Sequence, residues 1–254
     1  MTGTGLTPGL LARYLQQQRE LGGPELFLEG LDRSQALALA SKGKVLADVS
    51  KSAPGRGASN VAAPRTEVPG PLPQDYESLK AEASACQRCD LAKSRKNVVF
   101  SDGNPRARLM VVGEAPGAQE DKTGLAFVGP AGKLLDLLLA AVGLSRAESA
   151  YICNVLKCRP PGNRNPLPGE IEECTPFLRK QIELISPQAI LAVGTFSGQF
   201  LTGKSQPLGR LRGEVYSYQG VPVVVSYHPA ALLRNWGWTR ATWDDLQLLR
   251  QVMD

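Results

Sequence analysis

A tight, acid-rich turn follows an apolar run near the middle of the chain. The run LMVV at 109–112 is followed directly by GEAPGAQEDKTGLAFVG at 113–129. Gly113 and Gly117 allow the backbone to bend sharply and to approach a ligand closely. The three acidic side chains of this loop would repel phosphate, and the loop ends with a lone aromatic residue, Phe127. The pattern therefore indicates a pocket for a neutral, hydrogen-bonding ring at the end of a strand.

Four of the five cysteines have spacings typical of metal ligands. Cys86 and Cys89 form a C-x2-C pair, and fifteen residues separate Cys158 from Cys174. Four thiolates bind either a tetrahedral zinc or a [4Fe–4S] cluster, and the wide second spacing favours the cluster. The fifth, Cys153, lies within an apolar stretch and is expected in the core.

The single histidine, His228, stands in the segment SYHPAALLRN after a second apolar run at 222–226. A lone histidine is usually a surface residue or a satisfied core residue. This one falls where a buried strand ends and where Pro229 marks the start of a helix. Its place at the carboxyl end of a strand makes it a candidate site residue, while the lack of a second histidine disfavours multi-histidine metal chemistry.

Strands and helices alternate from Asp75 onward, and these elements must position the candidate residues. Strands are expected at 108–112, 151–155, 189–193 and 222–226, and helices at 76–84, 132–141, 169–185, from about 196, and at 240–252. Apolar strands separated by helices favour a parallel sheet covered on both faces. We therefore expect a three-layer α/β/α sandwich with a central, mainly parallel, four-stranded sheet.

The first 74 residues differ in composition from the rest. Residues 50–74 hold five prolines, three glycines and no aromatic residue, which leaves too little apolar surface to offset the entropy of ordering. We expect a helical N-terminal extension at 1–49, a flexible linker at 50–74 and the functional domain at 75–254. The extension is as consistent with an accessory arm as with a segment that docks a protein partner.

The overall composition, with 21% charged and 43% apolar residues, is that of a soluble globular protein. No apolar run approaches the ~20 residues of a membrane span, and no secretory pattern opens the chain. We therefore expect a cytoplasmic monomer without a membrane partner. The net charge of +5 suits an anionic partner but does not identify one.

The candidate residues together resemble a known family. The acidic turn, the segment HPAALLRN, Asn154 at the end of YICN and the four spaced cysteines occur in the order found in the iron–sulfur-containing (family 4) uracil-DNA glycosylases. The resemblance covers roughly residues 80–250. It implies a hydrolase that flips uracil, the product of cytosine deamination, out of DNA and leaves an abasic site for base excision repair. It also implies a [4Fe–4S] cluster on the four cysteines.

The resemblance assigns roles to individual residues. His228 is expected to donate to uracil O2 as the base leaves as an anion, and Glu114 to polarise water or stabilise the cationic sugar. Asn154 is expected to read the base through its amide. Phe127 is expected to stack on the base, and Glu120 to exclude the 5-methyl group of thymine.

Further residues are expected to complete the pocket and to contact DNA. Familiar uracil glycosylases of another family have Asp at the position of Ala115, so the assignment of water activation to Glu114 stays open. The remaining predicted contacts are Gly113 and Ala115 at the base, Leu232 or Leu233 as a wedge, Arg234 at a phosphate, and Arg164 in a second DNA-facing loop.

Other classes of function also stay open. A catalytically silent or covalently DNA-linking relative of the same fold would use the cluster as a staple, and an electron carrier would need redox partners but no base pocket. The covalent relative uses a histidine after the asparagine strand, whereas NVLKCRPPGNRNP contains none. The candidate pocket favours the glycosylase, with single- or double-stranded uracil-containing DNA as its partner, at the nucleoid in a prokaryotic cell.

Overall fold

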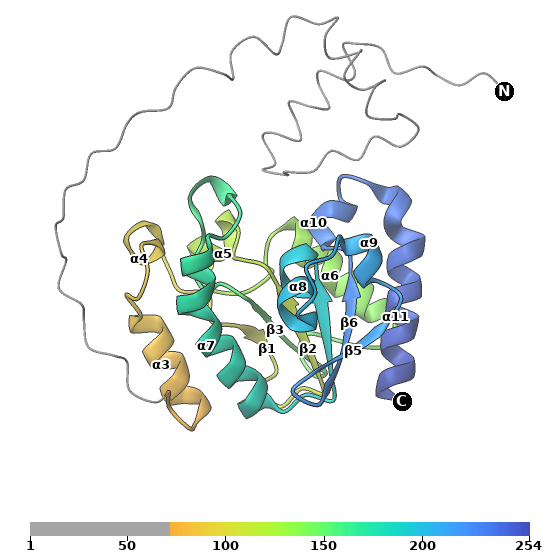
Figure 1. Cartoon of the computed structure of the whole chain (residues 1–254), viewed down its shortest axis with the longest axis horizontal. Helices are drawn as coiled ribbons and strands as arrows, with labels where there is room; N and C mark the ends of the chain where they lie inside the picture. Colours follow the sequence, from red (N-terminus) through yellow and green to blue (C-terminus); the bar gives the residue numbers. More distant parts are fainter. Residues whose placement is uncertain (1–71) are drawn as a thin grey trace, which may run out of the picture. The chain divides into compact units, whose positions relative to one another are not determined.

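A twisted six-stranded sheet forms the centre of residues 72–254, the part of the chain that the computed structural model describes (Figure 1). Its strands in spatial order are β1 (Asp102–Gly103), β3 (Ala150–Asn154), β2 (Leu109–Gly113), β4 (Ala189–Val193), β6 (Val221–Ser226) and β5 (Val215–Tyr218). The middle four are parallel, which confirms the expected α/β fold and its four-stranded parallel centre. The edge strands β1 and β5, which the sequence did not predict, pair antiparallel with their neighbours.

The central strands read as apolar runs because both of their faces are covered. Every residue of β2, β3 and β4 is buried. By contrast, β1 has only two residues, and β5 reads VYSY with alternating exposure. Short or half-solvated edge strands lack a long apolar run, so the sequence pattern contains no strong signal for them.

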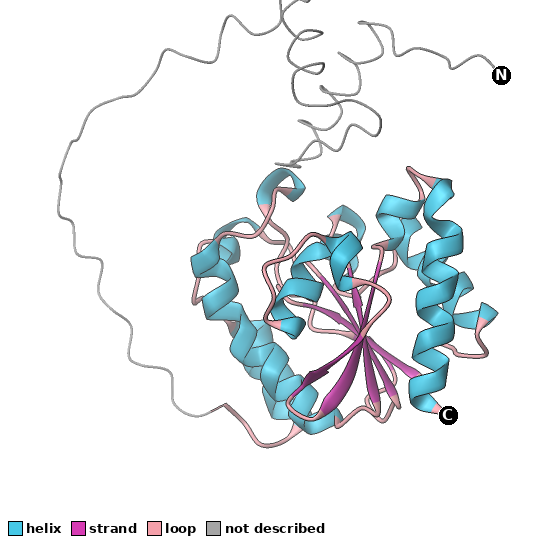
Figure 2. Cartoon of the chain, turned by 45° about the vertical axis from the view of Figure 1, so that its right-hand side comes forward, coloured by secondary structure: helices cyan, strands magenta, loops and turns pink. Residues whose placement is uncertain are grey.

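Helices cover both faces of the sheet, as Figure 2 shows. The longer ones are α3 (Tyr76–Ala85), α6 (Pro130–Ala141), α7 (Pro168–Ile185), α8 (Thr195–Thr202) and α11 (Thr239–Met253), and the short ones are α4 (Leu91–Ser94), α5 (Ala118–Thr123), η1 (Pro161–Asn163), α9 (Leu208–Leu211), α10 (Pro229–Leu232) and η2 (Trp236–Trp238). One face packs against α6 and α11, and the other against α7, α8 and α9. The three expected layers are therefore present. None of the helices within residues 72–254 is long and apolar enough to cross a membrane.

The predicted helices and strands of residues 75–254 are all present, with ends within two residues of the expected positions. Three α-helices, α6, α7 and α10, and the 3-10 helix η1 begin with a proline, which fits the first helical position because that residue needs no backbone donor. The expectations for residues 1–71, namely the N-terminal helical extension and most of the linker, lie outside the described residues.

The two ends of the sheet differ in the residues that they present. At the carboxyl end, Gly113 of β2 lies opposite Asn154 of β3, and β6 leads through Tyr227 to His228. At the start of β6, a tight turn at Gln219 and Gly220 joins it to β5, with positive φ angles of 51° and 86°. Positive φ at both central residues is typical of a two-residue hairpin turn. The candidate site residues therefore gather at the end of β6 that is remote from this turn.

Candidate active site

Gly113, at the end of β2, lies against two of the predicted pocket residues, Asn154 and Phe127. A Cβ atom on Gly113 would clash with the Asn154 Oδ1 atom and would lie 2.6 Å from Phe127 Cζ. Distances this short do not occur between a real side chain and its neighbours, so any larger residue here would displace the Asn154 amide or the Phe127 ring. The structure thus brings Gly113, Asn154 and Phe127 into one place, as the acidic turn and the YICN strand predict.

The rings of Phe127 and His228 are stacked. Their centroids are 5.4 Å apart, and the planes differ by 30°. A flat base stacked on Phe127 would therefore be nearly parallel to the imidazole and close to it.

The hydrogen bonds of His228 define which ring nitrogen can donate. Its Nδ1 atom accepts the N–H of Ala230 at 3.1 Å in the first turn of α10, so a neutral ring carries its proton on Nε2. Burial, together with the positive charge of Arg234, lowers the pKa of His228 to about 4, although Glu120 acts in the opposite direction. At neutral pH the site therefore contains a neutral imidazole whose Nε2–H is a donor.

Glu114 follows Gly113 and occupies an environment that disfavours its charge. Its backbone carbonyl accepts the N–H of Leu156, which joins this turn to the segment after β3. Within residues 72–254 no hydrogen bond reaches its carboxyl group. Burial raises the pKa of Glu114 from 4.5 to about 7. A carboxyl group in this state can exchange a proton near neutral pH.

Asn154 offers a buried acceptor without a partner. The residue is 1% exposed, and its Oδ1 atom accepts no hydrogen bond. A buried polar atom without a partner is costly and rare in native structures. An N–H group of a ligand in the pocket would satisfy this acceptor.

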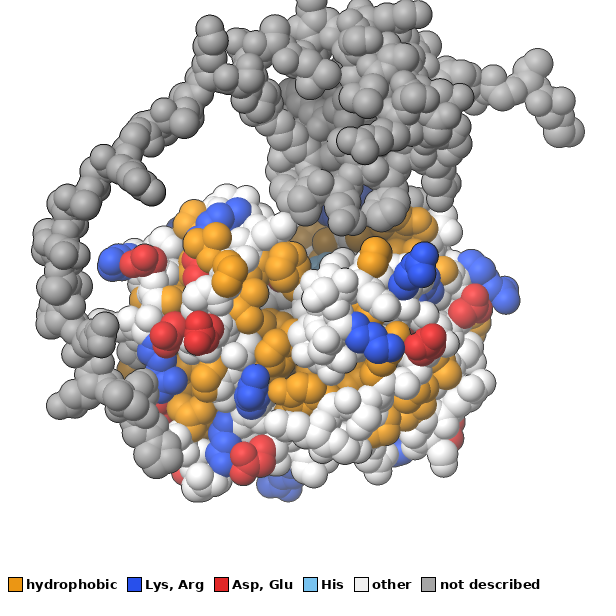
Figure 3. Space-filling model, in the orientation of Figure 1, with side chains coloured by type: hydrophobic (Ala, Val, Ile, Leu, Met, Phe, Trp, Pro, Cys, Tyr) orange, Lys and Arg blue, Asp and Glu red, His pale blue; other side chains and the backbone are white. Residues whose placement is uncertain are grey.

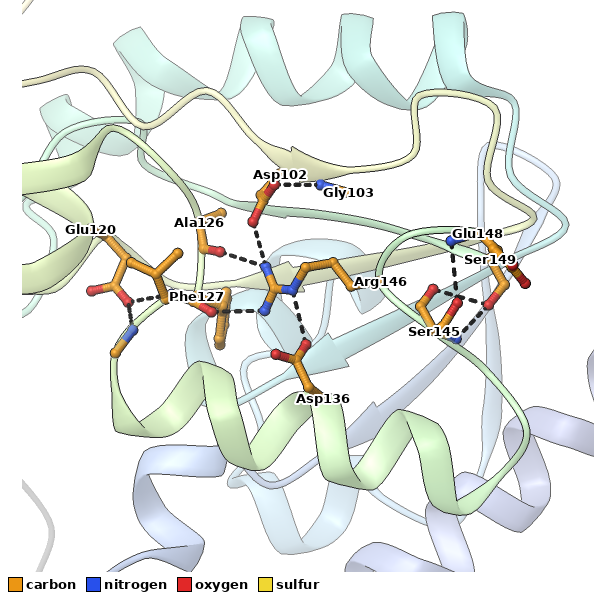
Figure 4. Close-up of polar contacts among 12 residues, drawn as sticks. Asp102, Gly103, Glu120, Ala126, Phe127, Asp136, Ser145, Arg146, Glu148 and Ser149 are labelled. Atoms are coloured by element: carbon orange, nitrogen blue, oxygen red, sulfur yellow. Dashed lines mark hydrogen bonds and ion pairs between the residues drawn. The ribbon is translucent and has the colours of Figure 1, made fainter.

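Glu120 lies beside the pocket but is already engaged by the backbone. Its Oε1 atom accepts the N–H groups of Val128 at 2.9 Å and of Gly129 at 2.8 Å, immediately before α6 (Figure 4). The carboxylate therefore closes the loop that contains Phe127. Ala115, another predicted base contact, packs instead in the apolar cluster of Leu156 and Cys158. A part for Glu120 in excluding thymine stays a prediction.

The structure distinguishes the two leucines proposed as a wedge. Leu232 is 0% exposed, whereas Leu233 is 39% exposed. A side chain that enters the space vacated by a flipped nucleotide must reach the surface, so the exposure favours Leu233 over Leu232 as the predicted wedge. Arg234 follows it and is exposed, and its charge acts on His228.

Arg164 does not present a free cation to DNA. Its guanidinium binds the carboxylate of Glu170 with two hydrogen bonds of 2.9 and 2.5 Å. The Glu170 Oε2 atom also accepts the N–H of Leu167 at 2.8 Å. The ion pair offsets the charge of Arg164 and stabilises the start of α7, and the contact of Arg164 with DNA stays a prediction. On the visible part of the face drawn in Figure 3, basic and acidic side chains are interspersed.

The four spaced cysteines line one small cavity together with Leu91, Arg95, Lys157 and Phe177. Cys158 Sγ accepts a hydrogen bond from Arg95 Nη1 at 3.3 Å, and Cys174 Sγ accepts one from the Lys157 N–H at 3.2 Å. Burial raises the pKa of Cys174 to about 12. Within residues 72–254, no group of three or more His, Cys, Asp or Glu side chains is arranged to hold a single metal ion. Cys153 is buried in the core, as predicted.

Three basic residues near these sites lack any signal in the sequence motifs. Arg95 binds Cys158 and the carbonyl of Cys86, and so links the two halves of the cysteine set. Lys157 is 2% exposed and donates from Nζ to the Asn154 carbonyl at 2.7 Å. The third, Arg146, binds the backbone beside Phe127. Each is separated from its partners by turns whose course the sequence pattern does not specify.

Known proteins with similar sequences were compared with this chain. The sequence model of the Uracil DNA glycosylase superfamily matches residues 100–247. A Type-4 uracil-DNA glycosylase of Archaeoglobus fulgidus is 44% identical over 168 residues, which are 63% of this chain and 84% of that protein. The Type-4 uracil-DNA glycosylase of Thermotoga maritima is 45% identical over 161 residues, which are 63% of this chain and 83% of that protein. A Type-5 uracil-DNA glycosylase of Pyrobaculum aerophilum is 34% identical over 152 residues, which are 53% of this chain and 66% of that protein.

Proposed function

This chain belongs to the uracil DNA glycosylase superfamily and, within it, to the type-4 enzymes, and we propose that it hydrolyses the N-glycosidic bond of uracil in DNA. The product is an abasic site for base excision repair. The observation that carries the proposal is the unpartnered acceptor of Asn154 beside the near-parallel rings of Phe127 and His228. This arrangement suits a flat ring that presents an N–H group to one side and a carbonyl oxygen to another.

Asn154 would select uracil against cytosine. Its Oδ1 atom would accept the uracil N3–H, and its amide N–H would donate to uracil O4. Cytosine has an acceptor at N3 and a donor at N4, which is the opposite pattern. Each buried polar group left unpaired by cytosine would cost about 1–3 kcal/mol.

His228 would stabilise the departing base. Cleavage of the bond between uracil N1 and deoxyribose C1′ leaves negative charge on the base, much of it on O2. The neutral imidazole would donate Nε2–H to O2 as that charge develops. Loss of one such donor typically costs about 10²–10³ in rate.

Glu114 would act on the other reacting partner, the sugar and the attacking water. In its ionised form the carboxylate would polarise water or stabilise the cationic sugar, whose transition state resembles an oxocarbenium ion. With a pKa of about 7, both protonation states are populated near neutral pH. The unpaired carboxyl group supports this role.

Cys86, Cys89, Cys158 and Cys174 would hold a [4Fe–4S] cluster as a structural staple. Their four thiols line one cavity, and hydrogen bonds from Arg95 and Lys157 to two of the sulfurs are of the kind that thiolate ligands accept. A single zinc at about 2.3 Å from each sulfur requires a much tighter group of thiols. When bound, the cluster would cross-link the segment after α3 to the loop after β3 and to α7 itself.

The proposal is tested with an oligonucleotide that carries one labelled uracil. The brown protein is incubated with the oligonucleotide, and alkali then cleaves the strand at any abasic site. We expect scission at uracil and none in a thymine control. His228→Ala should lose at least a hundredfold in rate with unchanged cluster absorbance. Intact uracil DNA with fully loaded protein would instead support a silent DNA-binding relative.

A further inference from the structure

Phe127 has a backbone conformation that its residue type disfavours. Its φ angle is 54°, in the left-handed region, and its ring is 5% exposed. A bulky residue adopts this conformation only when its surroundings enforce it. Glycine would adopt it without strain, so the aromatic ring has a use at this position.

Arg146 is the residue that binds the backbone at this strained point, as Figure 4 shows. It lies in the loop between α6 and β3. Its Nη1 atom donates to the carbonyl of Ala126 at 2.8 Å, and its Nη2 atom donates to the carbonyl of Phe127 at 2.7 Å. The guanidinium therefore spans two consecutive carbonyl groups on either side of the left-handed turn.

Two carboxylates fix the guanidinium itself. Nη1 also binds Asp102 Oδ2 of β1 at 2.8 Å, and Nε binds Asp136 Oδ1 of α6 at 2.9 Å. The Asp102 carboxylate is oriented in turn by the N–H of Gly103 at 2.8 Å. The Arg146 side chain is only 19% exposed. The sheet edge and a core helix thus hold a planar fork whose remaining donors point at the Phe127 loop.

This geometry matches what a left-handed residue requires. In an extended chain, successive carbonyl groups point to opposite sides, so one guanidinium cannot bind both. At Phe127 the left-handed turn brings the two carbonyls to the same side, where Arg146 donates to both. A Cβ on Gly132 would overlap the Phe127 carbonyl, which shows that α6 lies directly against it.

From these contacts we propose that Arg146 is a positioning residue: it holds Phe127 in the left-handed conformation that turns its ring toward the base pocket. The proposal rests on the proposed function, because it gives Phe127 the task of stacking on the flipped base. Without the guanidinium, the two carbonyls lose their shared donor and the loop relaxes. The ring then leaves its place beside Gly113 and His228.

The test is a double-mutant cycle with Arg146→Ala and Phe127→Ala, using single-turnover excision of uracil. Loss of a stacked aromatic lowers the rate about ten- to a hundredfold, and Arg146→Ala should approach the same loss. Because Arg146 acts through Phe127, the double variant should be no slower than Phe127→Ala alone. Arg146→Lys keeps the charge but lacks the planar fork, so it should stay impaired and also serves if Arg146→Ala does not fold.

Arg108→Ala is the matched control. Arg108 also bridges a side chain and a backbone carbonyl, those of Gln188 and Met253, but at the amino end of β2. We expect its rate to equal that of the wild type even where its melting temperature falls. Additive losses in the double variant, or an Arg146→Lys protein with the full rate, would overturn the positioning role while uracil excision stands. A wild-type protein that leaves uracil DNA intact would overturn the proposed function instead.

Discussion

Replacing Glu114 by Gln should stabilise the protein in alkaline solution while it lowers the rate of excision. The carboxyl group is largely buried and unpaired among the described residues, and its pKa rises from 4.5 to about 7. The folded state therefore holds this proton more tightly than the unfolded state does. Folding stability must fall as the pH rises from about 4.5 through 7, because the folded protein then carries an ion that it solvates poorly.

The size of the effect follows from the difference between the two pKa values. At about 1.4 kcal/mol per pKa unit, it corresponds to about 3 kcal/mol. Water still reaches part of the group, so about 2–3 kcal/mol is the expected cost of ionisation. Gln has nearly the same shape and does not ionise. The stability of Glu114→Gln relative to wild type should accordingly increase by about 2–3 kcal/mol between pH 4 and pH 8.

The measurement is urea or thermal unfolding of both holoproteins across this pH range. For a domain of this size, the relative change corresponds to a shift of about 4–12 °C in the difference between melting temperatures. Comparing the difference at two pH values cancels the cost of burying the amide. A difference that is constant from pH 4 to pH 8, or that decreases, would refute the buried, ionisable state of Glu114.

Four other results are expected. The rate of uracil excision should rise with pH through about 7 as Glu114 ionises, and this rise should be absent in Glu114→Gln. Above pH 5 the titration of His228 should not change the rate, because its imidazole is already neutral. Leu233→Ala should slow excision from duplex more than from single-stranded DNA, and equal slowing would exclude the wedge. Asp245→Ala should cost about 3–5 kcal/mol of unfolding free energy, because it removes the buried carboxylate that binds the Arg212 guanidinium and the Ser226 hydroxyl. Cys158→Ser should bleach and destabilise the protein, and a brown, stable variant would contradict the ligand assignment.

The sequence predicts the parallel core and the candidate pocket because each has a local signature. Apolar runs mark β2, β3, β4 and β6. The residues at or just after the carboxyl ends of β2, β3 and β6 meet because the strands of a parallel sheet all end on the same side. The choice between Leu232 and Leu233 depends on how α10 packs, which no local pattern specifies. Likewise, no sequence motif predicts the ion pair of Arg164 with Glu170, six residues away in the sequence.

Long-range polar contacts are the least predictable part of the site. Arg146 reaches Asp102, which lies 44 residues earlier in the chain, and it does so only because β1 pairs with β3 at the sheet edge. That edge pairing has no apolar signature of its own. The left-handed conformation of Phe127 is equally hidden, since aromatic residues rarely adopt it.

The hairpin turn at Gln219 and Gly220 offers a place to attach probes. Both residues are exposed, and the six residues of β6 separate them from the carboxyl end of the sheet by about 20 Å. A ligation tag inserted there could carry a fluorophore or a surface tether without blocking the carboxyl end of the sheet, where the nucleotide would bind. Individual molecules could then be followed as they slide along DNA between successive uracils, with the lesion-facing edge unobstructed.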